Sequence, residues 1–227
     1  SPSAPIVILG PQPAYTADDL LATSTGAIDP EGQTVTYSYV WQENGFLTSY
    51  TGSTLSASVT EKGDVWTVVV TPNDGLQDGP STVASINIDN SDPIITGIQI
   101  VPDPPQLTDT LTCQVTAVDP DSEPLTSTVA WINQSTGITL GSGDTITIDG
   151  NMAQPGDLLL CTVTVTDPDG AMTADSGQVT LGNALPDLVS VEILPAEPTV
   201  MDTVECGGLV TDEDNQGHTL SAEWYVG

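Results

Sequence analysis

The chain has 227 residues, with 31 acidic residues against a single Lys or Arg and a formal net charge of −30 at pH 7. This balance excludes nucleic acid and anionic membrane surfaces as partners, because both are bound through clusters of Lys and Arg. No apolar run approaches the roughly 18 residues that suggest a membrane-spanning helix, so we expect no membrane insertion. The acidic excess indicates either solubility in a cation-rich medium or specific binding of Ca²⁺, which takes carboxylate and carbonyl oxygens.

Three stretches repeat along the chain, at residues 18–22, 109–113 and 202–206, with spacings of 91 and 93 residues. A Pro-rich segment precedes each stretch, and an acidic turn and a Trp-bearing segment follow it. This period suits an immunoglobulin-sized sandwich and is too long for a solenoid repeat. We therefore divide the chain into repeat one (1–90), repeat two (91–183) and a partial repeat three (184–227).

Repeat one alternates apolar and polar residues, as half-buried strands do. Trp41 falls on one face of its segment with two tyrosines, and Trp66 shares a face with Val68 and Val70. Asn44 with the following Gly is a hairpin-turn signal. We expect strands at 6–9, 20–24, 35–42, 55–59, 65–70 and 83–88.

Repeat two carries Cys113, Trp131 and Cys161 in that order, each in an alternating apolar run. This order is the signature of an immunoglobulin-like sandwich, in which a Trp on strand C packs against a disulfide between strands B and F. A Cys113–Cys161 disulfide would imply an oxidising compartment outside the cytosol. We expect strands at 94–101, 111–118, 125–133, 145–148, 158–166 and 178–181.

Repeat one has no such Cys pair. Our alignment of the repeats places Ala22 and Trp66 at the positions of Cys113 and Cys161, so we interpret Trp66 as filling the space of the bridge. All four Trp residues are expected in the cores of their repeats: Trp41, Trp66, Trp131 and Trp224. The predicted fold class is all-β, with tandem immunoglobulin-like β-sandwich domains arranged head to tail.

Repeat three supplies only three expected strands, at 188–194, 203–210 and 220–226. Three strands cannot close a two-sheet core, and they leave open edges. We therefore interpret the chain as a piece of a longer one, in which Cys206 pairs with a Cys beyond the chain end. The alternative is that another chain supplies the missing strands by β-augmentation.

Acidic turns after strands B and F form the main candidate site. In an immunoglobulin-like sandwich these loops lie at the end where the chain enters, so they should face the linkers between repeats, at 89–93 and 183–187. A Ca²⁺ ion there would need about 6–8 oxygens. The open alternative is that Asp-Pro and Asn-Asp-Gly are ordinary turn formers on a solvated surface. The candidate ligands are Asp29, Glu31, Asp74, Asp89, Asp92, Asp119, Asp121, Asp167, Asp169, Asp187, Asp212 and Asp214.

The stretches "TADDLLATSTGAIDPEGQTVTYSYVWQENG" and "TEKGDVWTVVVTPNDG" resemble the tandem immunoglobulin-like repeats, PKD-like and cadherin-like, of large bacterial surface and secreted proteins. The resemblance implies an extracellular stalk, adhesin spacer, or filament or matrix component, often calcium-dependent. It is specific for architecture and weak for activity, since such repeats occur in many proteins.

His218, the only His, has no Cys or His neighbours at zinc spacing, and no Ser has an evident His or Lys base. Carboxylate pairs could serve a glycosidase, but acidic residues at turn tips lack the apolar pocket that raises a pKa, so we expect no catalysis. We expect a non-catalytic structural segment with Ca²⁺ at the interdomain junctions. Its expected partners are neighbouring repeats of the same or an identical chain and a cell-surface or glycan ligand. The alternative is an accessory ligand- or carbohydrate-binding module of a secreted enzyme or adhesin, with Phe46 and Tyr50 as exposed contacts.

Overall fold

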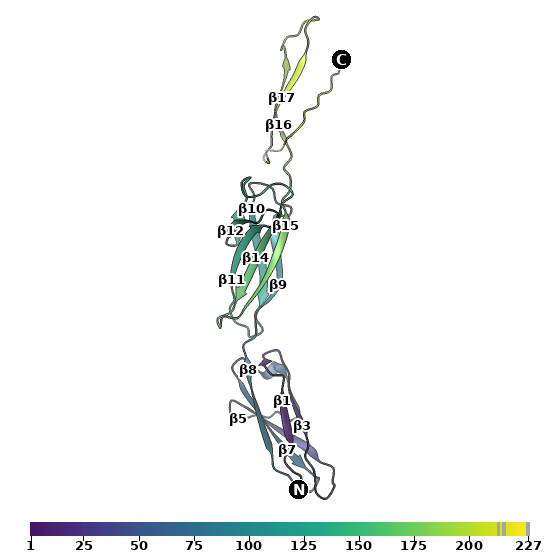
Figure 1. The fold of residues 1–227 in the computed structure, drawn as a ribbon, viewed down its shortest axis with the longest axis vertical. Helices are drawn as coiled ribbons and strands as arrows, with labels where there is room; N and C mark the ends of the chain where they lie inside the picture. The colour runs from purple at the N-terminus through teal and green to yellow at the C-terminus, as the bar shows by residue number, and fades with distance from the viewer. Residues whose placement is uncertain (213, 215–216, 226–227) are drawn as a thin grey trace. The chain divides into compact units, whose positions relative to one another are not determined.

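The computed structural model describes residues 1–212, 214 and 217–225. These residues form strands joined by loops, with one short 3₁₀ helix, η1 (Ala57–Val59), so the protein is all-β (Figure 1). No helix in the described part of the chain is long and apolar enough to cross a membrane. The chain forms two compact units. The first is Ser1–Ile94 with Ala117–Thr126 and Thr166–Thr173, and the second is Ile95–Thr116, Ser127–Val165 and Ala174–Gly227.

Repeat one folds as two facing sheets, the arrangement of an immunoglobulin-like sandwich. In the first sheet the strand order is β1 (Ile6–Gly10), β3 (Leu20–Thr25) and β6 (Thr54–Leu55). In the second it is β2 (Ala14–Tyr15), β8 (Thr82–Asp89), β7 (Val65–Asn73), β4 (Thr36–Glu43) and β5 (Phe46–Leu47). The register of β4 and β7 sets Trp41 opposite Val68. Because side chains alternate along a strand, this register turns every second residue of both strands into the core.

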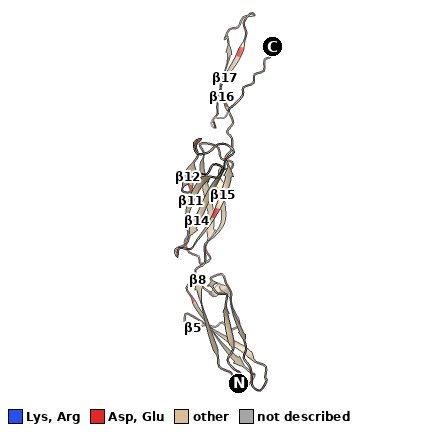
Figure 2. Cartoon of the chain, viewed as in Figure 1, with Lys and Arg blue, Asp and Glu red and all other residues tan. Residues whose placement is uncertain are grey.

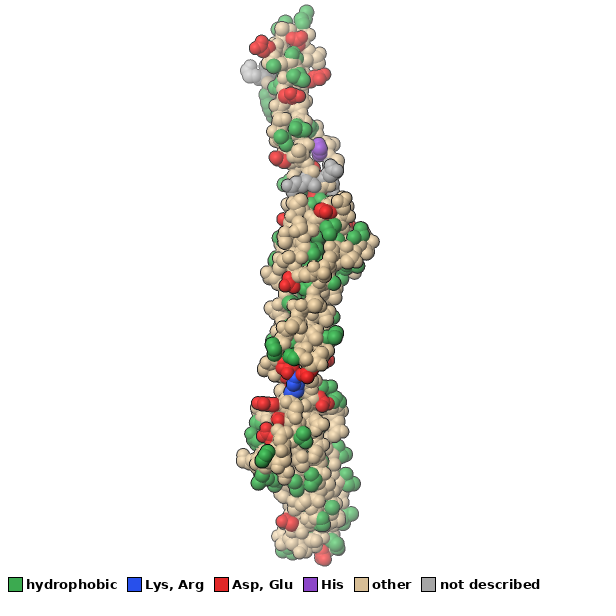
Figure 3. All heavy atoms as spheres, turned by 90° about the vertical axis from the view of Figure 1, so that its left-hand side faces the viewer, with side chains coloured by type: hydrophobic (Ala, Val, Ile, Leu, Met, Phe, Trp, Pro, Cys, Tyr) green, Lys and Arg blue, Asp and Glu red, His purple; other side chains and the backbone are tan. Residues whose placement is uncertain are grey.

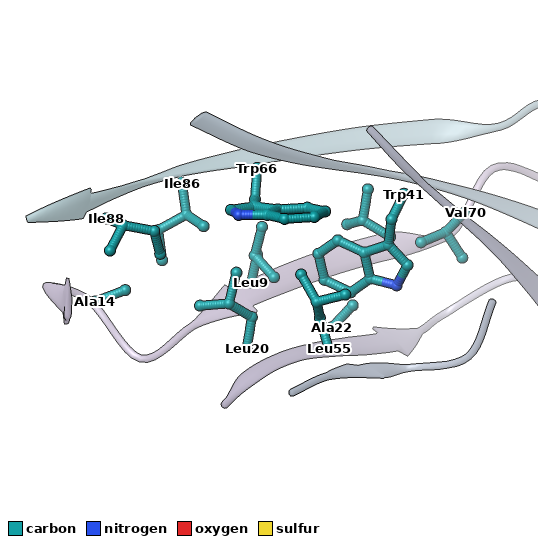
Figure 4. Packing of buried hydrophobic residues seen from close by; sticks show 11 residues of the cluster. Leu9, Ala14, Leu20, Ala22, Trp41, Leu55, Trp66, Val70, Ile86 and Ile88 are labelled. Atoms are coloured by element: carbon teal, nitrogen blue, oxygen red, sulfur yellow. The ribbon is translucent and has the colours of Figure 1, made fainter. Parts of the chain in front are cut away.

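The core of repeat one is built around two fully buried Trp rings (Figure 4). The Trp41 and Trp66 ring centroids lie 6.5 Å apart with planes at 72°, the edge-to-face geometry that aromatic pairs prefer. Trp41 Nε1 donates a hydrogen bond to Gly52 O at 2.9 Å. Trp66 Nε1 is buried without a partner among the described residues, so this ring contributes through packing alone.

The expected strand at 55–59 is mostly absent, because β6 ends at Leu55 and η1 follows it directly. The Ser56 hydroxyl accepts from Ser58 N at 3.3 Å, and the Asp19 carboxylate accepts from Ala57 N at 2.7 Å. Such side-chain bonds to the backbone compete with the pairing of a strand. The short strands β2 and β5 were not expected from the pattern, since each is only two residues long.

Repeat two also forms two sheets, and the expected disulfide Cys113–Cys161 is present. Trp131 is buried, and its Nε1 donates to Gly143 O at 2.9 Å, as Trp41 does to Gly52 O. The strand order in one sheet is β13 (Thr145–Thr147), β10 (Thr110–Val118) and β9 (Ile94–Val101). In the other it is β12 (Ile138–Ser142), β11 (Thr126–Asn133), β14 (Leu158–Thr166) and β15 (Met172–Thr180).

Equivalent hydrogen bonds fix how β7 of repeat one corresponds to β14 of repeat two. At the start of both strands, a turn Gly donates its amide to a carbonyl at or directly after the end of the last strand of the repeat. At the end of both, a Thr hydroxyl of the neighbouring strand donates to the backbone. The bonds are Gly63 N to Ile88 O (2.9 Å) and Gly156 N to Leu181 O (2.8 Å), then Thr36 Oγ1 to Asn73 O (3.3 Å) and Thr126 Oγ1 to Thr166 O (3.2 Å). Both ends give a spacing of 93 residues along these strands.

The match of Trp66 with Cys161 is therefore wrong. Cys161 corresponds to Val68, and Trp66 corresponds to Leu159. The alignment followed the turn after the strand, where "TPNDG" resembles "TDPDG", and this shifted the register by two residues. Because side chains alternate with a period of two, such a slip keeps all four residues on the buried face. The burial pattern could not have revealed it.

Repeat three forms one antiparallel pair of strands, β16 (Asp187–Leu194) and β17 (Glu205–Thr211). No strand occurs at 217–225, and residue 226 of the expected strand 220–226 lies outside the described residues. Trp224 is 57% exposed, contrary to the expected core position, because no second sheet faces this pair in the described part of the chain. Cys206 is exposed and unpaired among the described residues, and its pairing with a Cys outside the chain stays a prediction.

Candidate functional site

Most acidic residues lie in the connections between strands (Figure 2). The loops after β3, β10 and β17 share one local turn, in which the first Asp accepts a hydrogen bond from the backbone amide two residues later. The three bonds are Glu31 N to Asp29 Oδ1 (3.2 Å), Asp121 N to Asp119 Oδ1 (2.7 Å) and Asp214 N to Asp212 Oδ1 (2.9 Å). This is the usual role of Asp in a turn, and it occupies one carboxylate oxygen of each first Asp.

Five acidic residues of repeat two, all within the first compact unit, make up what we call the acidic loop cluster: Asp119, Asp121, Glu123, Asp167 and Asp169. Carboxylate oxygens of the first three lie within 4.8 Å of one another. The other two come from the loop between β14 and β15. Four other residues of the unit donate hydrogen bonds to this cluster: Thr16, Lys62, Asn90 and Ser91.

Asp121 holds the segment that follows β8. Its Oδ2 accepts from Ser91 N at 2.7 Å, and its Oδ1 accepts from Ser91 Oγ at 3.2 Å. The hydroxyl of Thr16 also donates to Asp121 Oδ1. Ser91 is buried, so its backbone amide would be left unsatisfied without this carboxylate. Asp121 therefore ties a loop of repeat two to the end of repeat one.

Asn90 makes the second such tie, to Asp167. Its Nδ2 donates to Asp167 Oδ2 at 2.7 Å and to Ser91 O at 3.1 Å. Asp167 is buried, and its Oδ1 accepts from Ala171 N at 2.9 Å. The hydrogen bond from Asn90, supported by backbone amides of the loop, holds the pKa of Asp167 below its usual value.

Lys62 brings the only Lys or Arg side chain of the protein to the acidic loop cluster (Figure 3). Its Nζ forms ion pairs with Asp169 and Glu123 and donates to Asn90 Oδ1 at 3.1 Å. Hydrogen bonds to Asp169 and then to Glu123 raise the pKa of Lys62 well above its usual value. The ammonium therefore stays charged throughout the physiological pH range.

Two oxygens of the acidic loop cluster, Asp119 Oδ2 and Glu123 Oε2, are buried without a hydrogen-bond partner among the described residues. A buried carboxylate oxygen without a partner costs free energy, and a bound cation would remove that cost. With the nearby Asp121 they offer three carboxylates to a hard cation, whose ligands are oxygens. The donor set therefore fits a divalent cation such as Ca²⁺.

Three further predicted ligands lie in the loops of repeat one. Asp29 is buried, and its Oδ2 has no partner among the described residues. Asp74 Oδ1 accepts from Leu76 N and Gln77 N, both at 2.8 Å. These two backbone bonds, the one from Gln77 first, lower the pKa of Asp74. The Ser1 amine lies 3.7 Å from an Asp74 carboxylate oxygen and 4.0 Å from one of Glu31.

Asp89, Asp92 and Asp187 are exposed, and the structure does not bring them into the acidic loop cluster. The neighbouring Asn90 and Ser91 contact the cluster instead. Sequence reasoning missed these two as individual contacts, together with Thr16 and Lys62. A usable signal was the single Lys in a chain with 31 acidic residues, since an isolated cation in such a chain is expected to find carboxylates.

The contacts of Asp121 recur in repeat three, 93 residues later. Asp214 Oδ2 accepts from Ala184 N as Asp121 Oδ2 accepts from Ser91 N. Asn183 Nδ2 donates to Ala184 O at 2.6 Å, the same local bond that Asn90 makes to Ser91 O. Asp214 is only 4% exposed, and its Oδ1 has no partner among the described residues. The capture of the linker backbone is thus a repeated feature.

Replacing Asn90 with Ala should raise the pKa of Asp167 toward its usual value of about 3.9, because the largest cause of the lowered pKa is removed. Asp167 adds stability above its unfolded-state pKa and loses it as the pH falls through the folded-state pKa. The stability difference between wild type and N90A should therefore be largest at neutral pH and shrink below about pH 4. Carboxyl NMR titration measures the pKa directly. Asp74 is the internal control, since backbone amides lower its pKa, and a shift of both residues alike would contradict this account.

No family model matches the chain, and no similar sequence was found among curated proteins. Among solved structures, a two-domain fibronectin type III segment of chicken tenascin is similar, with 13% identity, a TM-score of 0.40 and coverage of 79% of this chain and 98% of that one. The chicken interferon gamma receptor alpha chain has 9% identity, a TM-score of 0.43 and coverage of 80% and 98%. Three N-terminal domains of the bacteriophage RB49 outer capsid protein Hoc have 12% identity, a TM-score of 0.33 and coverage of 95% and 71%.

Proposed function

We propose that the chain is a non-catalytic structural repeat segment of an extracellular protein, a stalk, adhesin spacer or filament component, stiffened by Ca²⁺ between its repeats. The observation that carries this proposal is the repeated capture of the linker backbone, Ser91 N by Asp121 and Ala184 N by Asp214. A spacer needs the same connection at every junction. A single ligand-binding site would not require this repetition.

Two properties support an extracellular setting. The chain has a disulfide, Cys113–Cys161. Disulfides persist in oxidising compartments and are rare in reducing ones. A net charge of −30 causes strong self-repulsion, which a cation-rich medium relieves. The resemblance to bacterial surface repeats, noted from the sequence, points the same way.

Ca²⁺ binding is supported by the acidic loop cluster. Asp119 Oδ2 and Glu123 Oε2 lack partners among the described residues, and both oxygens of Asp121 already hold the linker. A Ca²⁺ ion on these three carboxylates would join the free oxygens to the group that anchors Ser91. Binding would then rigidify the linker directly. Ca²⁺ sites of extracellular modules commonly have dissociation constants of about 10⁻⁴–10⁻³ M.

The test is a thermal or urea unfolding series with Ca²⁺ or EDTA at constant ionic strength. A Ca²⁺ concentration ten times the dissociation constant should stabilise the wild type by about 1.4 kcal/mol. Asp119→Asn should abolish most of this gain, because it removes the charge beside the oxygen without a partner. Asp175→Asn is the matched control, since Asp175 lies exposed on β15. Equal Ca²⁺ responses in D119N and D175N would indicate general charge screening and refute the site.

A second candidate function is suggested by the exposed side chains at the edge strand β5. Phe46 is 78% exposed and Leu47 is 73% exposed, so two adjacent large apolar side chains face solvent on this edge strand. An accessory binding module would present such a patch to a glycan or another ligand. NMR titration with oligosaccharides distinguishes the two functions, since shifts confined to residues 46–50 would favour the binding module.

A further inference from the structure

Lys62 lies in a turn whose backbone conformation is fixed by hydrogen bonds. Gly63, next to it, has a φ of +88° and donates its amide to Ile88 O at 2.9 Å. Glu61 N donates to Asp64 Oδ2 at 2.9 Å across the same turn. The turn thus fixes the backbone on both sides of Lys62, and the side chain extends from it to the acidic loop cluster with only 24% of its surface exposed.

The ammonium group of Lys62 has three hydrogen-bond donors, and three acceptors surround it: Glu123, Asp169 and Asn90. The pair with Glu123 is the better shielded, because the Glu123 side chain is 21% exposed and that of Asp169 is 55% exposed. Exposed ion pairs contribute little to stability, so the Glu123 pair should dominate. Lys62 therefore already supplies one positive charge where the cluster would bind a metal ion.

Glu123 connects the ammonium to the candidate cation site. Its Oε1 accepts from Lys62 Nζ. Its Oε2 is buried and has no hydrogen-bond partner among the described residues. A divalent ion on Asp119, Asp121 and Glu123 would share this carboxylate with the ammonium. Two cations on one carboxylate repel each other, and each weakens the hold of the other.

The position of Lys62 has no counterpart charge in repeat two. The equivalent turn places Pro155 there, because Gly156 N donates to Leu181 O as Gly63 N donates to Ile88 O. Pro carries neither a charge nor a side-chain donor. The ammonium is therefore a special feature of the first acidic loop cluster and not part of the repeated connection itself.

We propose that Lys62 is a built-in cation of the acidic loop cluster that competes with Ca²⁺ for Glu123, the one carboxylate that both would contact. Its charge holds the cluster together when Ca²⁺ is absent and weakens Ca²⁺ binding when Ca²⁺ is present. This inference rests on the proposed function for the Ca²⁺ site and adds to it the residue that sets the affinity. Lys62 would make the first junction less dependent on the Ca²⁺ concentration than a junction without a Lys.

Isothermal titration with CaCl₂ of the whole chain tests the proposal. Lys62→Met, which keeps most of the unbranched side chain but removes the charged group, should tighten Ca²⁺ binding about tenfold, equivalent to about 1.4 kcal/mol. Lys62→Gln should do the same, because it too lacks the charge. Gln178→Glu is the matched control, since it makes the net charge more negative by the same amount at an exposed position of β15. Q178E should leave the affinity close to that of the wild type.

Unfolding in EDTA gives the second readout. K62M should unfold at a lower temperature than the wild type in EDTA, and this difference should vanish or reverse at saturating Ca²⁺. If K62M and K62Q bind Ca²⁺ no more tightly than Q178E, while the wild type binds and D119N does not, the competition is refuted and the proposed function stands. If neither the wild type nor K62M binds Ca²⁺ at 10 mM or less, roughly ten times the weakest affinity expected of such modules, both are refuted.

Discussion

Replacing Trp66 with Ala should lower the free energy of unfolding of repeat one by about 3–5 kcal/mol. The ring is fully buried, meets Trp41 edge-to-face at 6.5 Å, and lies 6.1 Å from the ring of Tyr50. Its removal leaves a cavity that the facing sheet cannot fill. Because Trp66 Nε1 has no partner among the described residues, the loss comes from packing and not from a hydrogen bond.

Urea unfolding followed by far-UV circular dichroism measures this loss. Trp224→Ala is the matched control, because Trp224 is the one Trp that the structure places largely in solvent. Its replacement should change the free energy of unfolding by less than about 0.5 kcal/mol. A loss below about 1 kcal/mol for W66A would mean that the two Trp rings do not form the core of repeat one.

A disulfide can be engineered into repeat one at the positions that correspond to Cys113 and Cys161 of repeat two. The hydrogen bonds that relate β7 to β14 make Val68 the counterpart of Cys161. Ala22 is the counterpart of Cys113, since their amides donate to equivalent carbonyls, Ser53 O and Asp144 O. The double variant A22C/V68C should therefore form a disulfide under oxidising conditions. Its loop is close in length to the one of 48 residues in repeat two, so it should stabilise repeat one by up to about 4 kcal/mol.

The double variant A22C/W66C is the control for the register. It follows the alignment that the structure contradicts, and it should stay reduced and lose the packing of Trp66. Mass spectrometry after blocking of free thiols distinguishes the outcomes, and unfolding with and without a reductant measures the stabilisation. A disulfide in A22C/W66C but not in A22C/V68C would show that the register derived from the hydrogen bonds is wrong.

The sandwich architecture could be predicted from the sequence because it depends on features with a short range. Alternation of apolar residues marks most strands of repeats one and two, and the order Cys113, Trp131, Cys161 marks the disulfide and the Trp that packs beside it. Register is harder, since a slip of two residues keeps the same face buried. Only the hydrogen bonds at both ends of β7 and β14 separate Val68 from Trp66 as the counterpart of Cys161.

The sequence predicts which kind of residue forms the candidate site, but not most of its individual contacts. The turn residues Asp119, Asp121 and Asp167 were named, since Asp-Pro turns are visible in the sequence. The individual linker contacts were not, because Asp89 and Asp92 carry charge but are exposed, while the neutral Asn90 and Ser91 form the hydrogen bonds to the cluster. Which of two adjacent residues turns inward depends on the path of the linker, and composition does not encode that path.

The central claim is that Ca²⁺ on the acidic loop cluster stiffens the linker that Asp121 holds. Backbone ¹⁵N relaxation of Ser91 and its neighbours, measured in Ca²⁺ and in EDTA, tests it most directly. In Ca²⁺ the order parameter of the Ser91 amide should reach about 0.85, as in rigid backbone, and in EDTA it should fall. An order parameter for Ser91 that is the same in Ca²⁺ and in EDTA would contradict the account.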